Sequence, residues 1–176
     1  MEIAAAALPE HGAIALLAAL DDRLAAALKS CAIKLVCADF IRSDDGLESR
    51  LQRRQDLEEL ERSTGLRVFL PPDEAVAALR ANNRAIGALT YCWASPDHPK
   101  ADLAAIRRFL RSAMGAHVKA IFWDYASLFQ LPRSPTQNST FIDALSVMGD
   151  LCTPSRIERL ALSRCGTHAT RALYAH

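Results

Sequence analysis

The chain has 176 residues, and its 21 basic and 20 acidic side chains leave a formal net charge of +1. A chain of this length fits one domain, and the balanced charge provides no summed field that would attract nucleic acid or an anionic membrane. The hydrophobic pattern decays beyond Pro154. We therefore expect a single domain in residues 1–154 and a C-terminal segment, 155–176, that is helical or poorly ordered.

Cysteine use and the N-terminal sequence indicate where the protein resides. The five cysteines form an odd set without a C-x-x-C pair, which favours a reducing compartment. The Ala/Leu-rich N-terminal stretch has no preceding basic region, and Asp21 and Asp22 interrupt it before it reaches a bilayer-spanning length. The sequence thus predicts a cytoplasmic protein without a membrane span. No metal site is expected, because the histidines and cysteines never approach ligand spacing.

In the first half of the chain, apolar residues at helical spacing predict an amphipathic helix over residues 13–29. Residues 33–38 are apolar and β-branched, which predicts a first strand before the polar turn Asp44-Asp45-Gly46. Residues 47–63 are dense in charge and predict an exposed helix or a long ordered loop. In this segment, Arg50, Arg53 and Arg54 are expected to lie on a solvated face and to pair with nearby glutamates.

In the second half, residues 66–70 predict a strand that ends at two prolines, and a helix follows to about residue 81. Residues 86–93 and 118–124 predict two further strands joined by a helix. That helix should turn Leu103, Ile106 and Leu110 towards the core and three arginines outwards. A last helix is expected to begin at a cap on Asn138 or Ser139. Its apolar stripe would contain Phe141, Ile142, Leu145, Met148 and Cys152.

These elements predict a three-layer α/β domain with about four mostly parallel strands and flanking helices. In an open α/β sheet, ligands bind beyond the carboxyl ends of the strands. One rim would therefore gather five polar or aromatic side chains, from Trp93, Ser95, Asp124, Tyr125 and Gln130.

The chemistry of this rim is open at the level of sequence. The Asp124 carboxylate can bind a ribose hydroxyl, act as a base, or cap the following loop. Trp93 can stack on a ring or belong to the core. The chain has neither a Walker A sequence nor a G-x-G-x-x-G fingerprint, so a phosphate would have to be held by a helix N-terminus or by Arg84.

Two motifs and a helix resemble one known family. Residues 88–93 read Ala-Leu-Thr-Tyr-Cys-Trp, residues 121–130 read Ile-Phe-Trp-Asp-Tyr-Ala-Ser-Leu-Phe-Gln, and residues 141–148 follow the pattern Phe-x-x-Ala-Leu-x-x-Met. This order is similar to the core of the HET (heterokaryon incompatibility) domain and of related TIR-like proteins. The match extends roughly over residues 86–151. The resemblance implies a flavodoxin-like parallel sheet, self-association and a role in signalling, and some TIR relatives cleave NAD.

Three hypotheses of function follow from this resemblance. The first is a signalling or protein-interaction module that acts by self-association and keeps a vestigial nucleotide crevice. The second is a hydrolase that releases nicotinamide from NAD, with Asp124 or Glu158 as the essential carboxylate and Trp93 stacked on the ring. Glu158 is the sole glutamate after Asp124 and has no tryptophan near it, and no further strand is expected after Cys152. The third is a truncated domain without independent activity. No resident cofactor is predicted, and NAD enters as the substrate of the second hypothesis.

Overall fold

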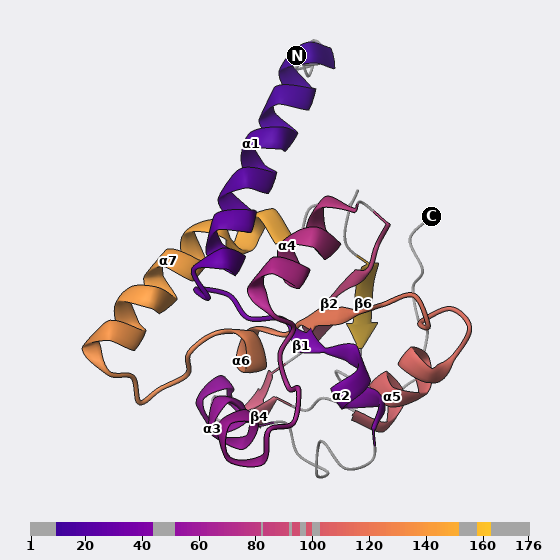
Figure 1. Ribbon diagram of the computed structural model, residues 1–176, viewed down its shortest axis with the longest axis vertical. Coiled ribbons are helices and arrows are strands. Elements are labelled where there is room, and N and C mark those ends of the chain that lie inside the picture. Colours follow the sequence, from indigo (N-terminus) through magenta and orange to yellow (C-terminus); the bar gives the residue numbers. More distant parts are fainter. Residues whose placement is uncertain are drawn as a thin grey trace, which may run out of the picture.

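The computed structural model describes residues 10–43, 52–81, 83–91, 93–95, 98–99, 103–151 and 158–162. Helices make up most of these residues (Figure 1). They are α1 (Glu10–Lys29), α2 (Ala38–Arg42), α3 (Arg54–Thr64), α4 (Pro72–Arg80), α5 (Leu103–Arg111), α6 (Asp124–Ser127) and α7 (Pro135–Leu151). The strands are β1 (Val36–Cys37), β2 (Ile86–Tyr91), β3 (Trp93–Ser95), β4 (His98–Pro99), β5 (Ala120–Phe122) and β6 (Glu158–Leu162). None of the helices within the described residues has both the length and the apolar character needed to cross a membrane.

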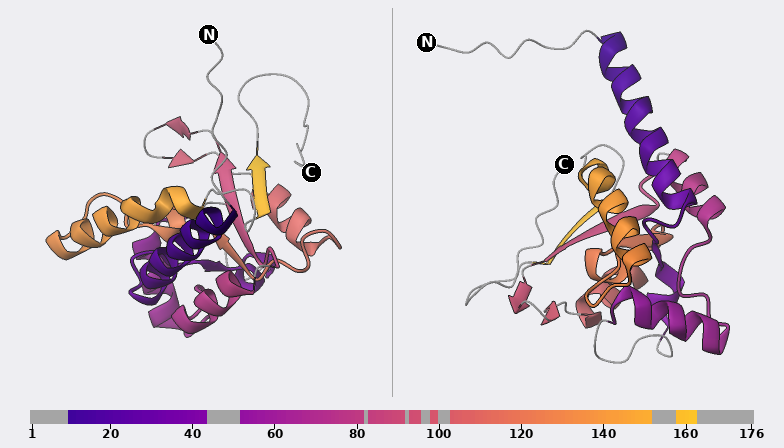
Figure 2. Two further views of the ribbon diagram at one scale, coloured as in Figure 1. Left: turned by 90° about the horizontal axis from the view of Figure 1, so that it is seen from above. Right: turned by 90° about the vertical axis from the view of Figure 1, so that its left-hand side faces the viewer.

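The main sheet is small and mixed. Its strand order is β1-β5-β2-β6, in which β2 runs parallel to β5 and β6 while β1 runs antiparallel to β5. β3 and β4 form a separate antiparallel pair, which lies apart from the main sheet in Figure 2. The expected flavodoxin-like sheet of four mostly parallel strands is therefore wrong. Short strands, one of them reversed, and a predominance of helix replace it.

Residues 66–70, which were expected to form a strand, make an isolated antiparallel bridge between Phe69 and Val36. The reason is the carboxylate of Glu61, whose Oε1 accepts hydrogen bonds from the backbone N–H groups of Val68 and Phe69 at 3.0 Å each. A side chain thus satisfies donors that a strand would direct to a ladder. The prolines at 71 and 72 follow directly, and α4 begins at the second of them.

The strand expected over residues 33–38 shrinks to the two residues of β1. At its start, the N–H of Ile33 donates to the carbonyl of Ala27 at 3.1 Å and so completes the C-terminus of α1. At its end, Ala38 begins α2. The end of α1 and the start of α2 therefore include residues at both ends of the apolar run, and only Val36 and Cys37 remain in the sheet.

Beyond residue 155, where no strand was expected, β6 pairs in parallel with β2 from Glu158↔Gly87 to Leu162↔Tyr91. The sequence Glu-Arg-Leu-Ala-Leu starts with two charged residues, which masks the apolar run that follows. An edge strand is the place where a sheet tolerates such charges. Sequence periodicity alone gave no reason to assign this strand.

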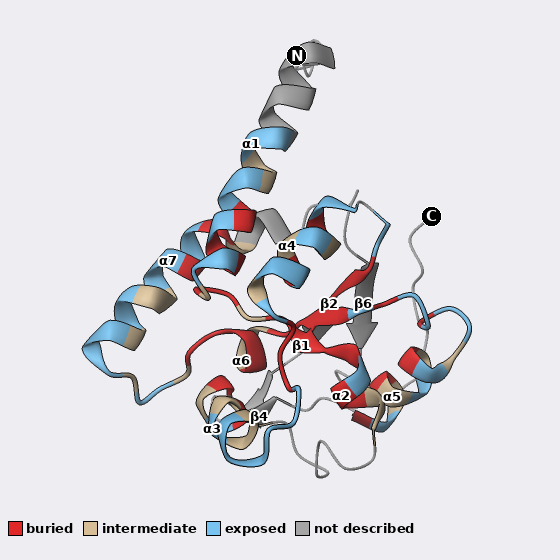
Figure 3. Ribbon diagram, in the orientation of Figure 1, coloured by how far each residue is buried: buried red, intermediate tan, exposed pale blue. Residues whose placement is uncertain are grey.

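The buried core forms two clusters that share the strands of the main sheet (Figure 3). Alternate residues point to opposite faces of a strand, so Ala120 and Phe122 belong to one cluster and Ile121 to the other. The first cluster joins the sheet to α1, α4 and α7, and the second joins it to α2, α3 and α5. On α5 the expected core face is confirmed, because Leu103, Ile106 and Leu110 are buried.

The start and the face of α7 differ from the expectation. The helix begins at Pro135, because Ser134 and Gln137 form a capping box: Gln137 N–H donates to Ser134 Oγ at 3.2 Å, and Ser134 N–H donates to Gln137 Oε1 at 3.0 Å. Ala144 and Val147 are the buried positions, whereas Ile142 and Leu145 are 58% and 44% exposed. Phe141 and Met148 pack partly buried against the first cluster. The expected stripe was thus rotated, and Cys152 lies outside the described residues.

The capping box can be separated from the cap that the sequence suggested. We expect Ser134→Ala to lower the free energy of unfolding by about 1 kcal/mol, because the Gln137 N–H loses its acceptor. Ser139→Ala, at an exposed position inside α7, should change it by less than about 0.5 kcal/mol. Urea denaturation followed by circular dichroism measures both. A larger loss for the Ser139 variant would contradict the assignment of Ser134 as the cap.

Candidate functional site

Asp124 lies at the first position of α6, directly after β5, and its side chain is half-buried. Its Oδ1 accepts a hydrogen bond from the N–H of Tyr125 at 2.6 Å. Its carbonyl accepts from the N–H of Leu128 at 3.0 Å. Within the turn, Ser127 Oγ also accepts from the N–H of Trp123 at 3.0 Å. Among the readings left open by the sequence, these contacts support the one in which Asp124 caps the turn after the strand.

Gln130 completes the same turn. Its side-chain Nε2 donates to the carbonyls of Asp124 at 3.1 Å and Leu128 at 2.9 Å. Its backbone is held by Gln55 of α3, whose Oε1 accepts from the Gln130 N–H at 3.1 Å and whose Nε2 donates to the Gln130 carbonyl. The spacing of Asp124 and Gln130, which carried the family resemblance, thus has a structural role that requires no ligand.

The aromatic residues beside this turn belong to the core. Trp123 is fully buried, and Tyr125 packs half-buried against the second cluster. Trp93 and Ser95 lie on β3, beyond the carboxyl end of β2, and only their backbone is described. Arg84 adopts a positive φ of 57° two residues before β2 begins, so it lies at the amino end of that strand. The structure therefore separates Arg84 from the end of the sheet at which Asp124 stands.

Asp124 and Glu158, the alternative carboxylates of the NAD-cleaving hypothesis, do not lie at the same level of the sheet. Glu158 pairs with Gly87, and Gly87 pairs with Ile121, so Glu158 stands three residues before the level of Asp124. It also lies two strands away, because the order is β5-β2-β6. At ~3.3 Å per residue and ~4.8 Å between strands, the offset is on the order of 10 Å along the strands and on the order of 10 Å across the sheet. This register gives no support to a shared catalytic centre.

The most heavily bonded side chain near the turn is Arg54, at the first position of α3 and 2% exposed. Its Nη1 donates to the carbonyls of Ala32 at 2.9 Å and Ser127 at 3.2 Å, and its Nη2 donates to the carbonyl of Cys31 at 2.7 Å. Its Nε contacts Glu58 Oε1 at 3.0 Å. The guanidinium carbon lies 3.8 Å from the centre of the Phe129 ring. Arg54 thus joins α3, the end of α1 and the turn around α6.

Arg54 pairs with Glu58 as expected, but the solvated position expected for it is wrong, because it is buried. Arg53 does lie on the surface, but its partner is an aspartate and not a glutamate. Arg53 is partly exposed and pairs with Asp56 at 2.9 Å on the surface of α3. Burial lowers the pKa of Arg54, and the neighbouring Glu58 carboxylate acts in the opposite direction. The signal that could have identified Arg54 is its position three residues before Leu57, which is buried on the same helix face.

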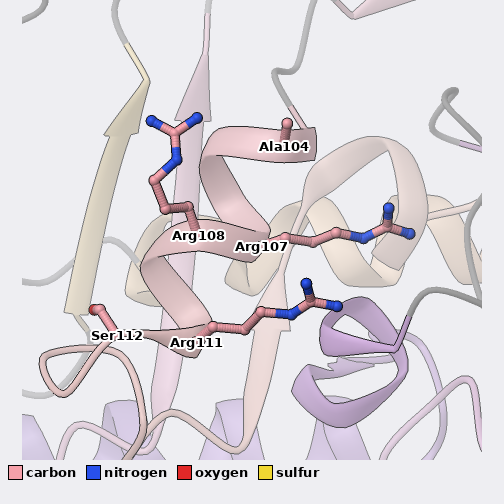
Figure 4. A pocket seen from close by; sticks show the side chains of 5 residues that line it. All are labelled: Ala104, Arg107, Arg108, Arg111 and Ser112. Atoms are coloured by element: carbon pink, nitrogen blue, oxygen red, sulfur yellow. The ribbon is translucent and has the colours of Figure 1, made fainter.

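A second group of arginines links α5 to α2. Arg107 Nε donates to the carbonyl of Ile41 at 3.0 Å, and Arg111 Nε donates to that of Arg42 at 3.0 Å, so both cap the last turn of α2. Arg42 in return donates to the carbonyls of Leu110 at 3.0 Å and Gly115 at 2.9 Å, beyond the end of α5. An open hollow of about 510 Å³ is lined by Arg107 and Arg111 together with Arg108, Ala104 and Ser112 (Figure 4). Sequence reasoning placed Arg107, Arg108 and Arg111 outwards, but it did not predict that side chains of α5 and α2 bind each other's terminal carbonyls.

Two of the five cysteines lie in the part of the chain that the structure describes. Cys31 and Cys37 are free thiols, and Cys37 is buried in the second cluster. Within the part of the chain that is described, no three histidine, cysteine, aspartate or glutamate side chains lie close enough together to hold a metal ion.

Comparison of the chain with family models, with curated proteins and with solved structures finds no match. The resemblance to HET and TIR-like proteins therefore stays a prediction from the two motifs and the helix that carry it.

The role of Arg54 is tested by removing its charge while keeping its length. We expect Arg54→Met to lower the free energy of unfolding by roughly 3 kcal/mol or more, because Glu58 and three backbone carbonyls lose a buried donor. The same change at its neighbour, Arg53→Met, removes a surface ion pair and should cost less than about 1 kcal/mol. Chemical denaturation of both variants measures these changes. Equal losses of unfolding free energy in the two variants would contradict the structural role assigned to Arg54.

The NAD-cleaving hypothesis also has a direct measurement. Because Asp124 caps its turn and Glu158 stands at a different level of the sheet, we expect purified protein to release no nicotinamide from NAD. Chromatographic detection of free nicotinamide over several hours measures this. Turnover that is abolished by Asp124→Asn or Glu158→Gln, in variants with unchanged circular dichroism, would show that one of these carboxylates is catalytic after all.

Proposed function

We propose that this chain is a protein-interaction module that self-associates through the N-terminal half of α1. The observation that supports this proposal is the position of that half. α1 runs from Glu10 to Lys29, and its first turns extend away from the rest of the molecule in Figure 1 and in the right-hand view of Figure 2. At 1.5 Å per residue, the helix is about 30 Å long.

The two halves of α1 have different surroundings. In the C-terminal half, Leu24, Ala25, Ala27 and Leu28 are buried in the first core cluster, against α4 and α7. In the N-terminal half, residues 12–20 contain no charged side chain, and Ala18 and Ala19 are exposed. By their spacing, Leu20 and Leu17 continue the helix face that carries Leu24 and Leu28. The apolar pattern of the sequence therefore continues beyond the part of the helix that the core covers.

A projecting helical segment without charged side chains, such as residues 12–20, gains stability when its apolar side chains are covered. Isolated helices of this length are marginal in water, and tertiary packing supplies most helical stability. A second copy of the chain brings the same projecting helix, so a two-fold arrangement can cover both faces at once. α7, which packs against α1, also carries two exposed apolar side chains, Ile142 and Leu145. A role in signalling rests on the family resemblance, whereas assembly is what these features support.

Self-association is tested by measuring molecular mass across protein concentration. We expect light scattering after size exclusion to give a mass that rises from monomer towards dimer as concentration increases. Leu17→Gln should raise the dissociation constant at least about tenfold, because a leucine on each copy loses its buried environment. The matched control Ala19→Gln lies on the opposite side of the helix and should leave assembly unchanged.

Two outcomes would overturn the proposal. One is a monomeric mass at every concentration from a sample whose circular dichroism shows that it is folded. The other is equal weakening by the two glutamine variants, which would place the interface elsewhere.

A further inference from the structure

One flank of α7 carries apolar side chains that the core covers only in part. Leu145 lies three residues after Ile142 and four after Phe141, and Met148 lies three after Leu145, so the four side chains share this flank. Phe141 and Met148 pack partly buried against the first core cluster, whereas Ile142 and Leu145 are 58% and 44% exposed. Exposed positions recur along α7 in Figure 3. These four residues are called the α7 stripe below.

The α7 stripe and the projecting half of α1 are similar in polarity. Among the 17 residues of α7, the charged ones are Asp143 and Asp150, and residues 12–20 of α1 include none. Charged groups are costly to remove from water, and they are depleted at the centre of protein interfaces. Contact between these two surfaces therefore requires little desolvation of charge.

Within one molecule, α1 leaves the α7 stripe uncovered. The C-terminal half of α1 packs against α7, and Arg23 Nη2 donates to the carbonyl of Ser146 at 2.8 Å. The N-terminal half extends away from the other elements in Figures 1 and 2. Residues 13–29 contain neither glycine nor proline, the usual causes of a sharp kink, so α1 does not fold back onto its own α7. A second molecule is needed to bring the two surfaces together.

The length of the projecting segment also points to a second helix in the interface. At 1.5 Å per residue, residues 12–20 make about 14 Å of helix, and one flank of a helix ~10 Å wide covers on the order of 100–200 Å² over that length. Stable interfaces bury about 800 Å² on each partner. Contact between two α1 segments alone is therefore small. α7 is about 25 Å long and adds a second flank on each copy, which brings the contact towards the size of weak associations.

We infer that the α7 stripe is the surface that receives residues 12–20 of α1 from a second copy of this chain. The dimer then contains two equivalent contacts, because each copy supplies one α1 and one α7 stripe, as two-fold symmetry requires. This inference rests on the self-association proposed above and names the part of the partner copy that α1 meets.

The first experiment compares two leucines of similar exposure. Leu145 is 44% exposed on the α7 stripe, and Leu66 is 40% exposed beyond the end of α3. We expect Leu145→Gln to raise the dimer dissociation constant at least about tenfold, as Leu17→Gln does, because a leucine in each contact loses its apolar environment. Leu66→Gln is the matched control and should leave the constant unchanged. Ile142→Gln, at a second exposed position of the stripe, should act like Leu145→Gln.

The second experiment mixes two variants and measures mass by light scattering after size exclusion. A dimer of one Leu17→Gln chain and one Leu145→Gln chain has both substitutions in the same contact and keeps the other contact intact. We therefore expect an equimolar mixture to give a higher mass than either variant alone at the same total concentration. Circular dichroism of each variant verifies that it is folded.

The outcomes separate this inference from the proposal on which it rests. Association that Leu17→Gln weakens, but Leu145→Gln and Ile142→Gln do not, would overturn the role of the α7 stripe and leave self-association through α1 intact. Weakening by all three variants without recovery in the mixture would also overturn the inference, because α1 would then not meet α7. A wild-type chain that is monomeric at every concentration would overturn the proposed function itself.

Discussion

The buried guanidinium of Arg54 is the contact on which the arrangement of the other elements depends. A charge with 2% exposure is stable only when its donors are satisfied, and Arg54 directs them to carbonyls at the end of α1 and in α6 and to Glu58 on its own helix. One of these carbonyls belongs to Cys31, whose backbone has a positive φ of 59°. Residues other than glycine seldom adopt such a φ. The guanidinium thus stabilises a turn that is unfavourable by itself, and it orients α1 relative to α3. The ring of Phe129 packs against the guanidinium of Arg54.

Short helices elsewhere in the chain use the same chemistry. The last carbonyls of a helix have no partner within it, and in a helix as short as α2 they are most of the carbonyls it has. Arg107 and Arg111 of α5 satisfy carbonyls of Ile41 and Arg42, and Arg42 satisfies carbonyls at and beyond the end of α5. Long cationic side chains therefore replace the strand ladders that a larger sheet would have supplied. This explains how the chain remains packed with few and short strands.

Local patterns predicted part of this structure, and the failures have physical causes. The apolar runs around Ile86 and Ile121 do form adjacent parallel strands, and Leu103, Ile106 and Leu110 form the buried face of α5. Sequence reasoning failed where a side chain competes with the backbone, as Glu61 does for the amides of Val68 and Phe69. It also failed where a charge is buried, because the three-residue spacing of Arg54 from the buried Leu57 is a weak signal in a segment that is dense in charge. The residues from Asp124 to Gln130 were rightly singled out as unusual, yet their contacts are those of a turn.

The place of β6 in the sheet affects how the protein is made. β2 lies between β5, which follows it by about thirty residues, and β6, which follows it by about seventy. At ribosomal rates of ~5–20 residues per second, several seconds pass between synthesis of Tyr91 and synthesis of Leu162. During that interval, one side of an uncharged strand, Ile-Gly-Ala-Leu-Thr-Tyr, has no chain of its own to pair with. The nascent protein therefore passes through a stage in which chaperones, or neighbouring chains on the same polysome, compete with β6 for this strand.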